Sequence, residues 1–152
     1  MTTRVPQPTD LLELANSQPH LGHSSWRQIT QEQVNLFADA TDDHQWIHVD
    51  PDRGKAGPFG TTIAHGYLTL SLTPVFIAEI LQVERIQMAM NYGLNKVRFP
   101  SPVPVGARVR AGLQLTAAQT RGRAIKAVLI MTVKVEGADR PACIAEVVVL
   151  YR

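Results

Sequence analysis

The stretch from Thr62 to Leu81, TIAHGYLTLSLTPVFIAEIL, decides the fold of this chain. Apolar side chains fall on most sides of a helix built from it, as they do in helices buried in a protein core. Its polar or helix-disturbing residues are too many for a membrane span: His65, Gly66, Thr69, Ser71, Thr73, Pro74 and Glu79. We therefore expect a core helix over residues 62–81, buried on all sides, and no attachment to a membrane.

After Asn91, apolar and polar residues alternate with a period of two, which is typical of strands that bury one face. Residues 124–136 alternate less cleanly, and residues 144–151 are apolar on both faces, which indicates an interior strand. The Pro-rich segment 101–106 predicts a turn. We expect three or four antiparallel strands linked by short turns. The clearest alternation sets Val109, Ala111, Leu113 and Leu115 against Arg108, Arg110, Gln114 and Thr116.

One face of such a sheet must be covered, and the helix over 62–81 is the only element apolar enough to cover it. The pattern therefore predicts the α+β class and the hot-dog fold, in which an antiparallel sheet wraps around a long central helix. The second face of the sheet and its edge would remain partly exposed. We therefore expect a homodimer whose sheets join edge to edge.

The length of 152 residues fits a single domain, 1–152, with residues 1–21 as an N-terminal lead segment that carries an amphipathic patch at 11–15. Apolar residues make up 45% of the chain and charged residues 18%, which excludes a disordered protein. The net charge is only +2 and the cations are scattered, so nucleic acid is not an expected partner.

The densest run of cations falls on the predicted strands and has two interpretations. One is a solvated face of the sheet. The other is an electrostatic landing site for an anionic ligand such as a CoA phosphate. The run comprises Arg108, Arg110, Arg121, Arg123 and Lys126.

Cys143 is the only cysteine, and its apolar neighbours indicate a small buried residue rather than a reactive thiol. The N-terminal sequence MTTRVPQPTD has neither the basic start nor the apolar run of a signal peptide. Together these features predict a cytoplasmic protein.

Residues 21–28 predict a first strand, and a helix then runs from Thr30 to about Thr41. Thr30 is a typical N-cap residue, and Gln33 occupies the capping-box position. Residues 42–62 lack any period and are rich in Asp, Gly, Pro and His. We expect a long ordered loop there, and long loops in compact domains tend to carry function.

Asp43 and His48 lie five residues apart in this loop, so a turn brings a carboxylate and an imidazole within reach of one water molecule. Such a pair acts as general acid and general base, because imidazole titrates near neutral pH. Trp46 and Ile47, which lie between them, would supply an apolar wall that excludes bulk water.

His65 and Gly66 stand near the predicted start of the buried helix. A helix N-terminus offers unpaired N–H groups, and a glycine there lets a carbonyl approach closely. The N–H of Gly66 is therefore a candidate donor to an oxygen that becomes negative during a reaction. His65 either contacts the substrate or holds the loop in place.

Residues 40–50, ATDDHQWIHVD, resemble the motif Gly-Asp-x-Asn-Pro-Leu-His of the MaoC-like and (R)-specific enoyl-CoA hydratases. The segments GTTIAHGYLTLSL and NKVRFPSPVPVGARV are similar to that family's helix start and to its following strand and turn. The motif's catalytic aspartate corresponds to Asp43 and its catalytic histidine to His48. Asp42, Gln45 and Trp46 replace the usual glycine, asparagine and proline.

The resemblance implies an (R)-specific enoyl-CoA hydratase of fatty acid metabolism. It would add water reversibly, in the syn sense, to trans-2-enoyl-CoA and give (R)-3-hydroxyacyl-CoA. Asp43 and His48 would be catalytic, whereas Gly66, Gln45 and His65 would bind the acyl-CoA thioester substrate. No cofactor is expected.

Three alternatives to this interpretation can be weighed from the sequence. His20 and His44 suggest a metal site with His48, but no second ligand pair has recognisable zinc spacing, so we expect no metal. The hot-dog fold also serves acyl-CoA thioesterases. A non-catalytic subunit that binds acyl thioesters is the third alternative.

Overall fold

The computed structural model describes residues 6–152, so the first five residues of the expected lead segment lie outside the description. The helices are α1 (Asp10–Leu14), the 3₁₀ turn η1 (Ala15–Ser17), α2 (Gln31–Thr41), α3 (Trp46–Val49), α4 (Pro51–Lys55), α5 (Gly66–Ser71) and α6 (Thr73–Ile80). The strands are β1 (His20–His23), β2 (Arg27–Gln28), β3 (Ala89–Arg98), β4 (Arg108–Arg121), β5 (Ala124–Val135) and β6 (Pro141–Tyr151).

The strands form one antiparallel sheet in the order β1-β4-β5-β6-β3, and β2 pairs with β4 as well. Four of the strands follow the central helix, where we had predicted three or four. The expected interior strand is β6, which pairs with β5 on one side and with β3 on the other. Strand β3 is therefore left at an edge of the sheet. The predicted first strand consists of two pieces, β1 and β2, which both run along β4.

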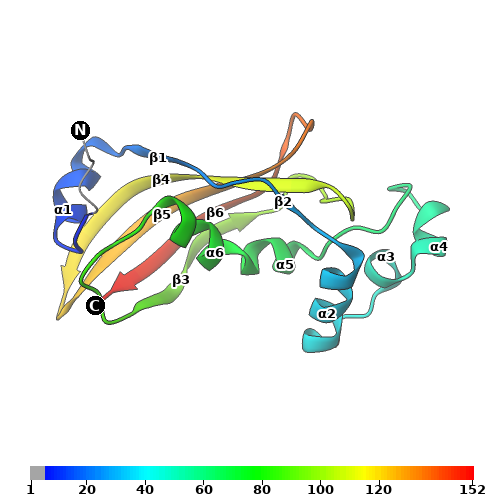
Figure 1. Cartoon of the computed structure of the whole chain (residues 1–152), viewed down its shortest axis with the longest axis horizontal. Coiled ribbons are helices and arrows are strands. Elements are labelled where there is room, and N and C mark those ends of the chain that lie inside the picture. The colour runs from blue at the N-terminus through cyan, green and yellow to red at the C-terminus, as the bar shows by residue number, and fades with distance from the viewer. Residues whose placement is uncertain (1–5) are drawn as a thin grey trace.

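The alternation predicted for β4 sets which face of the sheet is covered. Val109, Ala111, Leu113 and Leu115 are all 0% exposed, and Phe76 of α6 belongs to the same hydrophobic core. Burial of such apolar surface stabilises a fold by roughly 25 cal/mol per Å². Figure 1 shows α5 and α6 lying along one face of the curved sheet, with α2, α3 and α4 beyond one of its ends. The sheet thus wraps around a central helix, as predicted.

The central helix differs from the prediction in its start, its continuity and its burial. It begins at Gly66 rather than Thr62, because residues 62–64 are extended and bond to another segment: Ala64 N–H donates to Val103 O at 2.9 Å. It is interrupted at Leu72, and Pro74 lies in the first turn of α6, where its missing N–H costs nothing. Tyr67 is 70% exposed and Val75 is 42% exposed, so the expectation of burial on all sides was wrong.

We had expected the Pro-rich segment 101–106 to form a turn between neighbouring strands, and this expectation was wrong. Strands β3 and β4 lie at different places in the sheet, so the chain between them crosses the end of the sheet. On its way the segment pairs with the extended residues before α5, since Val105 N–H donates to Thr62 O at 2.9 Å. This crossing fixes the start of the central helix.

Residues 42–62 are less irregular than predicted, because they contain α3 and α4. Asp50 caps α4, since its carboxylate accepts a hydrogen bond from Arg53 N–H at 3.1 Å. Each helix spans about one turn and shows no apolar period, which is why the sequence pattern did not reveal them. In the described part of the chain, no helix has both the length and the hydropathy needed to cross a bilayer.

Candidate functional site

Asp43 begins the segment that follows α2. The helix ends at Asp42, which takes the left-handed conformation with a φ of 60°. Asn and Asp tolerate this conformation better than most residues, so the chain reverses direction here without a glycine. The Asp43 side chain is 53% exposed, and its Oδ1 accepts only a long hydrogen bond of 3.4 Å from Gln45 N–H. The carboxylate is thus accessible to a water molecule.

His48 is buried in the short helix α3, and its tautomer is set by the backbone. Its Nδ1–H donates to Ile63 O at 2.7 Å, so the neutral ring keeps a free lone pair on Nε2. Burial lowers the pKa of His48 below its ordinary value, and the neighbouring His65 lowers it further, whereas the Ile63 bond and Asp43 act in the opposite direction. His48 is therefore neutral, and able to accept a proton, at neutral pH.

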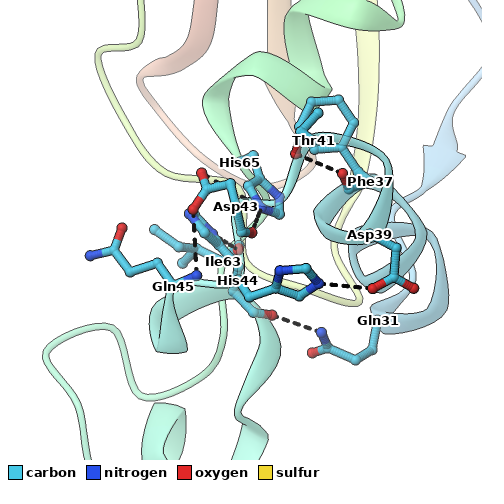
Figure 2. A network of polar contacts seen from close by, with 10 residues as sticks. Gln31, Phe37, Asp39, Thr41, Asp43, His44, Gln45, Ile63 and His65 are labelled. Atoms are coloured by element: carbon cyan, nitrogen blue, oxygen red, sulfur yellow. Dashed lines mark hydrogen bonds and ion pairs between the residues drawn. The ribbon is translucent and has the colours of Figure 1, made fainter.

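His65 holds the loop against the start of α5. Its Nε2–H donates to the backbone carbonyl of Asp43 at 2.9 Å, and its ring packs against Phe37 at 4.9 Å between centroids. Figure 2 shows His65 beside Asp43, with Ile63 close by. These contacts support the structural interpretation of His65. Its buried Nδ1 has no hydrogen-bond partner within residues 6–152.

Asp43, His48 and His65 each place one nitrogen or carboxylate oxygen in a cluster whose atoms all lie within 4.8 Å of one another. Nε2 of His65 carries a proton for its bond to the Asp43 carbonyl, so it has no lone pair to offer a metal. This nitrogen therefore holds the loop, and the arrangement of Asp43 and His48 suits proton transfer. His44 does not join the cluster, because its Nε2 pairs with Asp39 at 2.9 Å.

Gln31 is a positioning residue that the sequence analysis missed. From α2, its side-chain N–H donates to His48 O at 2.7 Å, and its Oε1 accepts a hydrogen bond from the Thr62 hydroxyl at 2.6 Å. It thereby ties α2 to α3 and to the strand-like segment before α5. An isolated glutamine in the first turn of a helix carries no sequence signal of such a role.

His48 and Gly66 face one cavity of about 340 Å³. Helix α5 has only six residues, so Gly66 offers an N–H that has no partner within residues 6–152, rather than the field of a long helix. A Cβ at Gly66 would lie 3.2 Å from the ring of Phe99. The glycine thus makes room for Phe99, and not simply for a ligand carbonyl as expected. The cavity is lined by His48, Phe59, Ile63, Ala64, Gly66, Thr69, Phe99, Pro100, Ser101, Pro102, Val103 and Ala142.

The wall of the cavity comes from other residues than we expected. The guanidinium of Arg53 lies over the Trp46 ring, 4.4 Å from the ring centroid, and Trp46 also packs against Gly57. Neither Trp46 nor Ile47 is among the residues that line the cavity. Phe59 and Phe99 form the apolar wall instead. The sequence analysis missed them because both lie outside the motif of residues 40–50. The side chain of Gln45 is exposed and points away from Asp43 and His65 (Figure 2), so its orientation gives no support for substrate binding.

The fold and the pair of Asp43 and His48 define a class of protein. Residues 15–137 match the family model described as MaoC like domain. The chain belongs to the MaoC-like dehydratase family and is a hydro-lyase with the hot-dog fold.

The chain is similar to several known proteins along most of its length. 3-Hydroxyacyl-thioester dehydratase Z of Mycobacterium tuberculosis (strain ATCC 25618 / H37Rv) is 58% identical over 132 residues, which cover 86% of this chain and 87% of that protein. Nodulation protein N of Rhizobium leguminosarum bv. viciae is 45% identical over 128 residues, which cover 82% and 80%. Among solved structures, the (R)-hydratase from A. caviae involved in PHA biosynthesis matches with a TM-score of 0.71 at 25% identity, over 88% of this chain and 96% of that one.

Proposed function

We propose that this protein is an (R)-specific hydratase of trans-2-enoyl-CoA, which adds water reversibly to give (R)-3-hydroxyacyl-CoA in fatty acid metabolism. One geometric relationship carries the proposal: Asp43 and His48 approach within 4.8 Å, while His48 and Gly66 face the same cavity. The name of the relative at 58% identity, a dehydratase of 3-hydroxyacyl thioesters, supports the same reaction.

In the proposed reaction Asp43 and His48 hold one water molecule over the C2=C3 bond. The free lone pair of His48 Nε2 takes a proton from this water as its oxygen attacks C3. The pair then returns a proton to C2, so one water supplies both added groups and no net proton is consumed. Addition from one side of the double bond is syn, and dehydration follows the same steps in reverse.

Gly66 would stabilise the enolate that forms when C3 is attacked. Its N–H has no partner among the described residues and lies at the cavity that His48 also lines. A hydrogen bond to the thioester oxygen is worth more in the transition state, where that oxygen is negative, than in the ground state, typically about 3 kcal/mol. Phe99, which covers Gly66, would move aside or pack against the bound thioester.

The acyl chain would follow the central helix. A cavity of about 390 Å³ lies between the α5–α6 junction and β3, and one of about 360 Å³ lies between α6 and the ends of β3 and β6. The two cavities share Pro74 and Asn91, so they adjoin each other, and both have largely apolar walls. Such walls suit a hydrocarbon chain.

We also propose that the protein is a homodimer joined through β3. This edge strand is exposed along most of its length, and its unpaired backbone groups are a template for another strand. Large apolar side chains gather on it or beside it: Met88, Met90, Tyr92 and Leu94. A second copy would cover them and extend the sheet across both subunits.

The direct test is hydration of crotonyl-CoA by the purified protein, followed by the loss of absorbance of the conjugated enoyl thioester. We expect the product to be (R)-3-hydroxybutyryl-CoA by chiral analysis. Release of free thiol without loss of the double bond would instead indicate a thioesterase. No turnover of any enoyl-CoA or enoyl-acyl-carrier-protein substrate would contradict the proposal and favour a binding subunit.

A further inference from the structure

A second cluster of titratable side chains lies on the face of the sheet that points away from α5 and α6. Arg110 of β4 alternates with the buried Val109 and Ala111, and Lys134 of β5 alternates with the buried Val133, so both cations point to this outer face. Together with residues of β1 they surround a cavity of about 260 Å³. It is lined by His20, His23, Arg110, Gly112, Thr132 and Lys134.

The two histidines reach this cavity because β1 contains a β-bulge. His20 and His23 are three residues apart and would point to opposite faces of a regular strand. The pairing of β1 with β4 shifts register between His20 and Gly22, and Gly22 takes a φ of 116°, a conformation that favours glycine. Both rings therefore lie together, with centroids 4.8 Å apart. Bulges that re-aim side chains in this way are frequent beside functional sites.

The ring nitrogens of both histidines approach the floor of the cavity, which Gly112 forms. A Cβ at this position would lie 3.2 Å from Nε2 of His20 and 3.3 Å from Nε2 of His23. Nδ1 of His20 accepts a hydrogen bond from Gly22 N–H at 3.1 Å, so the proton of the neutral ring is on Nε2. His20 therefore presents an N–H donor even when it is uncharged.

In the described part of the chain, the two cations of the cavity are not neutralised by a carboxylate. Arg110 and Lys134 are direct partners across the β4–β5 ladder, and like charges in that position destabilise a sheet. The guanidinium of Arg110 lies over the ring of Trp26, at 4.6 Å from its centroid. Within residues 6–152 no carboxylate forms an ion pair with either cation.

The surroundings of His23 reflect the same excess of positive charge. Burial lowers the pKa of His23, and Arg110, His20 and Lys134 lower it further by repulsion. The adjacent Arg108 differs from Arg110, because Glu136 pairs with it. Within residues 6–152, Arg110 thus lacks the counter-charge that Arg108 has.

We propose that this cavity on the outer sheet face is a binding site for a phosphate-class oxyanion. An anion there would accept hydrogen bonds from His20, Arg110 and Lys134 and would relieve the repulsion between the two cations. A metal ion is disfavoured, since the same two cations would repel it. The volume of about 260 Å³ suits a phosphate, a diphosphate or the phosphate end of a larger ligand. The site shares no lining residue with the cavity of His48 and Gly66.

Titration of the protein with sodium pyrophosphate at constant ionic strength tests the proposal, followed by calorimetry and by NMR of the imidazole groups. We expect saturable binding at one site and a rise in the pKa of His23, because an anion favours the charged ring. Lys134→Gln should weaken binding about tenfold or more, since a charge-assisted hydrogen bond is lost. Lys126→Gln is the matched control, because Lys126 lies on the same face of the same strand.

A charge-neutral variant separates a built site from general electrostatic attraction. Gly112→Ala leaves every charge in place but adds a Cβ against both histidine rings, so it should also weaken binding of pyrophosphate. Non-saturable shifts, or equal weakening by Lys134→Gln and Lys126→Gln, would overturn the proposal. A parallel titration with coenzyme A distinguishes the sources of the phosphate. Shifts of the same imidazole resonances by coenzyme A would assign the site to its phosphates, and shifts by pyrophosphate alone would assign it to a free anion.

Discussion

The imidazole rings of His48 and His65 are stacked, with centroids 3.8 Å apart and planes inclined by 23°. Each ring donates one N–H to a backbone carbonyl: His48 to Ile63 and His65 to Asp43. The pKa of His48 is lowered chiefly by burial and also by charge repulsion from the neighbouring His65. The stack thus helps to keep His48 in the neutral form that the proposed mechanism requires.

Asp43→Asn should lower the rate of crotonyl-CoA hydration by about 10²-fold to 10⁴-fold, the usual contribution of a positioned acid or base. Its melting temperature should stay close to that of the wild type, since the side chain is half exposed and makes only a 3.4 Å hydrogen bond. Asp42→Asn is the matched control, because asparagine also tolerates the left-handed conformation found there. Equal activity of the two variants would remove Asp43 from the mechanism.

The acid limb of the pH profile should report His48. Because burial lowers its pKa, the neutral base persists below the pH at which an ordinary histidine becomes charged. We expect the midpoint of the fall in kcat/KM for hydration to lie below about pH 6.5, the ordinary pKa of histidine. In His48→Gln this limb should vanish together with most of the activity. An acid limb whose midpoint lies above the ordinary histidine pKa would contradict the proposed role.

Gly66→Ala should lower kcat by about tenfold or more, because the new methyl group meets the ring of Phe99 at 3.2 Å and displaces either the ring or the N–H donor. Removing the obstacle should restore part of the rate, so the double variant Gly66→Ala with Phe99→Leu should be faster than Gly66→Ala alone. Steady-state kinetics on crotonyl-CoA measure both variants. If the second substitution gives no recovery, the loss does not arise from the contact with Phe99.

Gly54→Ala should destabilise the protein, although alanine favours a helix. A Cβ at Gly54 would lie 2.8 Å from the backbone nitrogen of Thr62, and a backbone atom gives way less easily than a side chain. We expect a loss of about 1–3 kcal/mol in the free energy of unfolding, measured with urea, which is typical of overpacking. Gly93→Ala is the control, since its Cβ would meet no atom within 4 Å. A stabilised Gly54→Ala protein would show that the segment before α5 moves readily.

Met90→Lys should convert the proposed dimer into a monomer, because a charge on an exposed edge strand opposes pairing with another strand. Sedimentation velocity measures the change in mass. Leu36→Lys on α2 is the control, since this side chain is also exposed but lies away from the β3 edge. A wild-type protein that sediments as a monomer would refute the proposed dimer.

The sequence by itself determined the α+β class, a run of three or four strands after the central helix, and the N-cap of α2 at Thr30. The hydroxyl of Thr30 accepts a hydrogen bond from Gln33 N–H at 3.2 Å. These features arise from local rules: a period of two for strands and a side-chain oxygen for a helix start. The motif also pointed to Asp43 and His48, which the fold brings within 4.8 Å.

Only the tertiary structure decided the surroundings of that pair. The start of α5 at Gly66 depends on pairing with the segment 103–105, and the wall of Phe59 and Phe99 depends on a crossing of the sheet. His48 stacks on His65, and Gln31 donates a hydrogen bond to His48 O of α3. In each of these two pairs the residues are 17 positions apart in the sequence. Such contacts depend on how separate elements pack against one another. Short-range periods and spacings in a sequence do not predict this packing.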